Sequence, residues 1–79
     1  MNYASGTSRT LRLAEEVRVE AARKRLTMST LAHGSDITYQ TLRRRLAGTH
    51  PFTVDELERV AAVLGVTVTE LFARTEVAA

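Results

Sequence analysis

Three polar residues, Gln40, Arg43 and Arg44, could do recognition chemistry from one side of a predicted helix. Positions 40 and 44 are four apart, so they share a helical face with Arg43 beside it. Leu42 and Leu46 lie on the opposite side of the same helix. In a DNA major groove, arginine is the favoured bidentate partner of guanine and glutamine that of adenine. The pattern therefore predicts a helix that packs on a core and presents Arg and Gln outward.

The residue types do not indicate zinc binding, catalysis or membrane insertion. The chain has no cysteine, and its two histidines, His33 and His50, are too few to hold zinc. No group of Asp, Glu, His or Ser forms a catalytic set, so we expect no enzyme, no cofactor and no small-molecule substrate. No apolar run reaches the roughly 20 residues that span a bilayer, and no signal peptide is recognisable. A cytoplasmic protein without a membrane partner is expected.

Charge is distributed unevenly along the 79 residues. Residues 1–50 hold nine Lys or Arg against four acids, a balance of +5, whereas residues 51–79 hold two against five, a balance of −3. Ten of the eleven basic residues are arginine. This asymmetry favours one surface built to meet a polyanion.

Hydrophobic spacing predicts an all-α domain of five helices, with a flexible arm at 1–7 and a tail at 75–79 around a domain at 8–74. The expected helices cover about 8–24, 28–34, 39–47, 54–64 and a last segment from 68. In the fourth helix, the predicted apolar stripe is Val54, Leu57, Ala61 and Leu64.

Capping residues mark where these helices begin and end. Thr27 and Thr38 are predicted N-caps of the second and third helices. The fourth and fifth helices each begin with a capping box, Thr53 with Glu56 and Thr67 with Glu70. Gly48 is expected to give the third helix a left-handed terminus, and Gly65 is expected to end the fourth helix.

The ordered set of these residues is similar to a known family. Thr27-Met-Ser-Thr-Leu-Ala, then Ile37-Thr-x-x-Thr-Leu, then Gly48, resembles the Cro and lambda-repressor-like helix-turn-helix family. Phe52 to Leu71 looks like that family's fourth and fifth helices. The family usually has Gly where this chain has Asp36, and often an apolar residue where it has Ser35. The resemblance implies a compact five-helix domain with the helix-turn-helix at its second and third helices.

The resemblance also implies DNA-binding roles by position, with residues 38–47 as the recognition helix in the major groove. Residues expected to meet base edges or nearby phosphates are Tyr39, Gln40, Arg43 and Arg44. Residues expected to meet the DNA backbone lie at helix starts and in the following loop: Thr27, Met28, Thr38, Thr49, His50 and Thr53.

Several residues admit two interpretations. Tyr39 is either a core aromatic or a DNA contact, and Arg45 lies nearer the apolar side, where it could pair with a carboxylate. The basic cluster at residues 23–25 either stabilises the end of the first helix or contacts DNA. Arg9 and Arg12, with Tyr3, either extend a minor-groove arm or form a tail. Apolar residues after the fourth helix could be core or a weak homodimer surface: Val66, Val68, Phe72 and Val77.

These expectations lead to two functions. The first is a sequence-specific regulator that binds double-stranded DNA, such as a small phage-type repressor or a Cro-like protein, acting as a dimer on a partly palindromic operator. The alternative is an antitoxin or anti-repressor of the same fold that acts by binding a protein partner.

Overall fold

The computed structural model describes the backbone of residues 3–77 and the side chains of residues 9–76. Within this part of the chain all regular structure is helical, as the sequence predicts. The five helices are α1 (Tyr3–Arg23), α2 (Met28–Ser35), α3 (Tyr39–Leu46), α4 (Val54–Leu64) and α5 (Val68–Val77).

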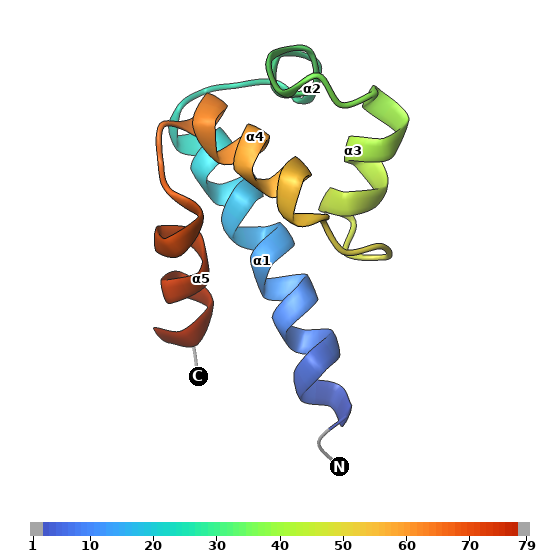
Figure 1. The fold of residues 1–79 in the computed structure, drawn as a ribbon, viewed down its shortest axis with the longest axis vertical. Helices are drawn as coiled ribbons and strands as arrows, with labels where there is room; N and C mark the ends of the chain where they lie inside the picture. The colour runs from blue at the N-terminus through green and yellow to red at the C-terminus, as the bar shows by residue number, and fades with distance from the viewer. Residues whose placement is uncertain (1–2, 78–79) are drawn as a thin grey trace.

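The helices are arranged in two groups around a shared core. α5 packs mainly on α1, and α2 packs on both α3 and α4 (Figure 1). The start of α1 and the end of α5 lie at the same end of the molecule, away from α2 (Figure 1). The helix-turn-helix pair, α2 and α3, is thus presented at the end opposite to the chain termini.

The core is built from one apolar stripe on each helix. Its fully buried members include Val17, Leu31, Leu42 and Leu71. The predicted stripe of α4 is confirmed at Leu57, Ala61 and Leu64, but it is wrong at Val54, whose side chain is 74% exposed. Val60 is fully buried instead. Position 60 follows 57 by three and precedes 64 by four, so Val60 lies on the same side of α4 as these two leucines, and this is the side that meets the core.

The predicted start of the first helix and the predicted tail after the last one also need correction. α1 begins at Tyr3 rather than near Ser8, so the expected arm at 1–7 is helical from residue 3. Each further residue adds one backbone hydrogen bond to an existing helix, which does not need a capping residue to extend. At the other end, the expected tail at 75–79 is part of α5 as far as Val77.

Thr75 explains why α5 continues into this segment. It lies four residues after Leu71, on the same buried face, and its side chain is fully buried. The hydroxyl donates to the backbone oxygen of Phe72 at 2.7 Å, which satisfies the polar group inside the helix. Within residues 3–77, no helix is both long and apolar enough to cross a membrane.

Candidate nucleic-acid interface

Threonine hydroxyls cap the two helices of the helix-turn-helix, as predicted. The Oγ of Thr27 accepts from the N–H of Thr30 at 3.1 Å, and the Oγ of Thr38 accepts from Thr41 at 3.2 Å. Neither helix has an acidic residue in its first turn. The partial positive charge of each N-terminus is therefore not offset by a carboxylate in its own first turn. Met28, the first residue of α2, is half-buried against the core.

The turn between α2 and α3 is held by its own backbone and by α4. Asp36 adopts the left-handed conformation, with φ 58°, as expected where the family usually has Gly. Ser35 is buried, and its hydroxyl donates to the carbonyl of Leu31 at 2.7 Å, so the polar side chain is satisfied. Arg59 donates to the backbone oxygens of Ser35 and Asp36, both at 3.0 Å. This role of Arg59 was not predicted from the sequence, because its partners lie 23 and 24 residues away.

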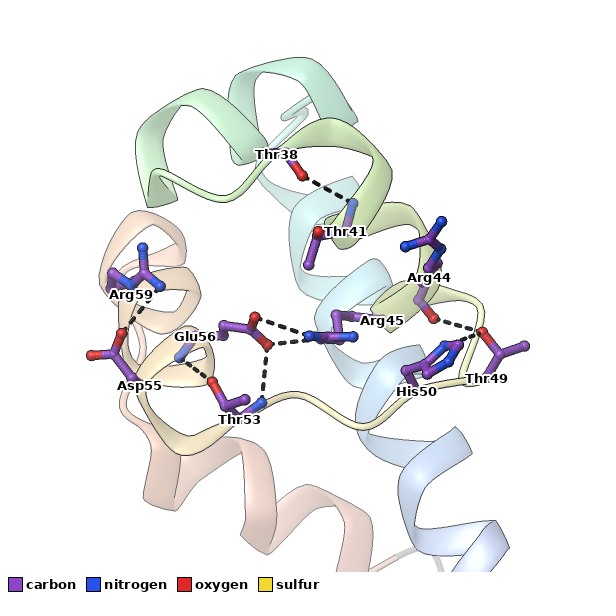
Figure 2. A network of polar contacts seen from close by, with 10 residues as sticks. All are labelled: Thr38, Thr41, Arg44, Arg45, Thr49, His50, Thr53, Asp55, Glu56 and Arg59. Atoms are coloured by element: carbon purple, nitrogen blue, oxygen red, sulfur yellow. Dashed lines mark hydrogen bonds and ion pairs between the residues drawn. The ribbon is translucent and has the colours of Figure 1, made fainter.

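α3 separates apolar and polar residues onto two faces. Leu42 and Leu46 are buried, while Gln40, Arg43 and Arg44 are exposed. Figure 2 shows the Arg44 side chain pointing away from α4. Tyr39, at the start of the helix, is 50% exposed, so its ring is shared between the protein surface and solvent. The predicted polar face is therefore accessible to a ligand.

Arg45 differs from its two neighbours. It points toward α4, where Nε donates to Oε1 of Glu56 at 2.8 Å and Nη2 donates to Oε2 at 3.1 Å (Figure 2). These hydrogen bonds lower the pKa of Glu56 and raise the pKa of Arg45. The interpretation that Arg45 pairs with a carboxylate is confirmed, although its partner was not identified from the sequence.

The loop between α3 and α4 carries three further predicted residues, of which Thr49 and His50 lie at the end of α3 and Thr53 caps α4. Thr49 donates from its hydroxyl to the backbone oxygen of Arg44 at 3.1 Å, and its Oγ lies 3.3 Å from Nδ1 of His50 (Figure 2). Thr53 forms the predicted capping box, in which its N–H donates to Oε1 of Glu56 at 3.0 Å and its Oγ accepts from Glu56 at 3.1 Å. All three threonine and histidine side chains are exposed.

The loop also needs a glycine. Gly48 has φ +79°, and a Cβ added there would meet Cδ2 of Leu11 on α1. The positive φ strains any larger residue at this position, and its Cβ would have to displace the exposed side chain of Leu11. Arg18 of α1 donates to the backbone oxygen of Leu46, at the end of α3. The C-terminal end of α3 is therefore fastened to α1.

Two residues of the basic cluster at 23–25 form ion pairs within the protein. Arg23 and Lys24 form ion pairs with Glu20, which is buried, at 3.2 and 3.4 Å. Arg74 of α5 pairs with the same carboxylate at 2.9 Å. The hydrogen bond from Arg74 is the main reason why the pKa of Glu20 is lowered. The ion pairs of Glu20 therefore join α1 to α5, and neither of these helices carries a predicted base contact.

The predicted dimer surface is divided by the structure. Val66 and Val68 are half-buried and pack against the core, whereas Phe72 is 39% exposed. The side chain of Val77 lies outside the described residues, as does that of Tyr3. Of the other arm candidates, Arg9 is exposed and Arg12 is half-buried.

The side chains of residues 9–76 contain no cluster of three or more His, Cys, Asp or Glu that could hold a metal ion.

Comparison with known proteins gives a family and no individual relative. No curated protein and no solved structure matches the chain significantly. Residues 16–76 match the family model of the Cro/C1-type HTH DNA-binding domain. That match covers all of α2 to α4, the last third of α1 from residue 16, and all but the last residue of α5. The chain belongs to the family of Cro/C1-type helix-turn-helix DNA-binding domains.

Proposed function

We propose that this chain is a sequence-specific transcriptional regulator that places α3 in the major groove of double-stranded DNA. The observation that carries the proposal is the exposure of Gln40, Arg43 and Arg44 on one face of a helix whose other face is buried. In this position Gln40 and Arg44 read base edges, since both residue types form bidentate contacts there. Tyr39 and Arg43 contact bases or the phosphates beside them.

Phosphate contacts fix the register of α3 on the duplex. We assign them first to the N-termini of α2 and α3, around Thr27, Met28 and Thr38, because backbone N–H groups at a helix start attract anions. The absence of acids from both first turns supports this assignment. Thr49, His50 and Thr53 form a second group of contacts at the other end of α3. Since Thr53 already gives its N–H to Glu56, its contribution is through the hydroxyl.

Two copies are proposed to share one operator, because a single recognition helix reads too few base pairs for a unique site. Two-fold pairing places the helices about 34 Å apart, one turn of DNA. Phe72 is the residue best placed for this contact, since Val66 and Val68 are partly used by the core. Sedimentation of the DNA complex tests this, and a single protomer on a minimal operator with unchanged affinity in Phe72→Glu would contradict it.

Selection from a random pool of DNA duplexes tests the function as a whole. The expected result is a consensus of two related half-sites, in the manner of a phage-type repressor or a Cro-like protein. Binding to the selected duplex should weaken with salt, at a slope of about −0.9 for each of four to six phosphates per protomer. A pool that is not enriched after repeated rounds would contradict sequence-specific binding.

A further inference from the structure

Arg45, the third arginine of α3, does not face the surface that Arg43 and Arg44 share. Arg43 and Arg44 are exposed, but the side chain of Arg45 is only 18% exposed and that of Glu56 only 13%. Figure 2 shows the guanidinium of Arg45 directed at α4 while that of Arg44 points the other way. One arginine in a run of three therefore has a protein partner in place of solvent.

Three hydrogen bonds hold the Glu56 carboxylate beside Arg45. It accepts two hydrogen bonds from Arg45 and a third from the N–H of Thr53. The bond from Thr53 fixes the carboxylate in the first turn of α4, so it cannot follow Arg45 if that side chain moves outward. Planar bidentate pairs of arginine and carboxylate are stronger than single ion pairs and fix the orientation of the guanidinium.

A free arginine at position 45 would have a different effect on DNA binding. An arginine beside the duplex is attracted to phosphates, and phosphate contacts strengthen binding to every sequence alike. An extra contact of this kind therefore reduces the preference for the correct site, because it holds the protein equally well on incorrect ones.

We infer that Glu56 is a positioning residue for DNA specificity, acting through Arg45: it keeps the third arginine of α3 away from DNA phosphates, so that binding depends more on base contacts. The inference rests on the proposed function and adds to it a residue that touches no DNA. It gives Glu56 a second role besides capping α4.

The test is Glu56→Gln, measured with two probes. One is the duplex that the wild type selects from a random pool, and the other is a scrambled duplex of the same composition. Glutamine can still accept the hydrogen bond from Thr53, so the cap of α4 is kept while the charge that holds Arg45 is lost. We expect affinity for the scrambled duplex to rise about five-fold at 0.1 M salt, with a salt slope steeper by about 0.9. The ratio of the two affinities should fall.

Two further variants separate this effect from a change in net charge. Glu58→Gln removes the same charge from the same helix, but Glu58 is exposed and lies about 200° around α4 from Glu56. It should leave the salt slope unchanged. The double variant Arg45→Gln/Glu56→Gln should return the scrambled-duplex affinity and slope to the wild-type values, because the freed arginine is no longer present.

Equal effects of Glu56→Gln and Glu58→Gln would overturn the inference. A shallower salt slope in Arg45→Gln alone would also overturn it, since it would mean that Arg45 already contacts phosphate in the wild type. This last variant decides the question even if Glu56→Gln does not fold. Absence of any salt-dependent duplex binding by the wild type would instead overturn the proposed function.

Discussion

The helix pairs α2–α3 and α4–α5 differ in how the N-termini of their helices are satisfied. Each helix begins with a threonine that accepts a hydrogen bond from its own first turn. The first turns of α2 and α3 hold no acid, whereas α4 holds Asp55 and Glu56 and α5 holds Glu70. In α4–α5, protein carboxylates offset the helix dipoles. In α2–α3, the first turns supply no such carboxylate, and the partner proposed for them is a DNA phosphate.

Arg43 and Arg44 of α3 also differ from the arginines of α4–α5, which form ion pairs with carboxylates. On α3, the side chains of Arg43 and Arg44 have no ion pair among the described side chains. On α4 and α5, Arg59 pairs with Asp55, and Arg74 pairs with Glu20. The comparison teaches that residue type alone does not mark a nucleic-acid surface. Arg43 and Arg44, which are proposed to contact DNA, differ from Arg59 and Arg74 in having no such ion pair.

The largest predicted effect tests whether the two pairs share one core. Leu42 of α3 and Leu57 of α4 are both buried, so Leu42→Ala and Leu57→Ala should each lower the free energy of unfolding by about 2–5 kcal/mol. Urea unfolding measures this, and both should remain single transitions. Val54→Ala is the control, because that valine is exposed and its loss should cost less than about 0.5 kcal/mol. Wild-type midpoints in both leucine variants would contradict the packing.

The second prediction compares one arginine from each pair. Arg44→Ala should weaken binding to the selected duplex by about 1–3 kcal/mol and relax the preference at one base position. Arg74→Ala removes the same charge from α5, where the arginine serves Glu20, and should leave that preference intact. Duplex titrations with single-base variants of the site measure both. If Arg44→Ala weakens selected and scrambled duplexes equally, a base-reading role for Arg44 is wrong.

The third prediction makes the start of α2 resemble that of α4. Thr30→Glu would complete a capping box with Thr27 and should stabilise the fold by about 0.3–1 kcal/mol. The new carboxylate takes the place proposed for a phosphate, so duplex affinity should fall about eight-fold at 0.1 M salt. Thr69→Glu adds the same charge to the first turn of α5 and should change affinity little. Equal losses in both variants would indicate general repulsion only.

The smallest predicted effect concerns acid. The pKa values of Glu20 and Glu56 are lowered below their ordinary value of 4.5, mainly by hydrogen bonds from Arg74 and Arg45. A carboxylate with a lowered pKa stabilises the fold above its unfolded pKa and ceases to do so as pH falls through the folded pKa. The urea midpoint should therefore be steady above about pH 5.5 and decline below about pH 4.5.

Substitution shows how much of this acid sensitivity comes from Glu20 and Glu56. In Glu20→Gln/Glu56→Gln, the decline below pH 4.5 should be smaller than in the wild type, while Glu58→Gln should keep it in full. An unchanged decline in the double variant would show that other carboxylates control acid stability.

Local features were predictable from the sequence because they are satisfied within a few residues. The caps at Thr27, Thr38 and Thr53 were all predicted and are confirmed, since each bonds to a group three residues along the chain. The left-handed conformations of Asp36 and Gly48 follow from the residue types in the same way. The division of α3 into a buried and an exposed face follows from its spacing alone.

Features that depend on how helices cross were not predictable. Arg45 and Glu56 are 11 residues apart, and Arg59 reaches carbonyls 23 and 24 residues away. Such pairs need the angle of α4 against α2 and α3, which spacing does not give. The exposure of Val54 was missed for a similar reason, because it depends on which side of α4 meets the core. The DNA contacts of the individual residues remain predictions.

The packing of α5 on α1 has a consequence for the protein as it is made. Leu71 and Thr75 are fully buried, and Arg74 joins Glu20 across 54 residues of sequence. A ribosome adds about 5–20 residues per second, so α1 emerges several seconds before the helix that covers it. During that interval the apolar side of α1, including Val17, has no α5 to pack against. The nascent domain completes its core only when α5 has left the ribosome, and until then it is open to chaperones and proteases.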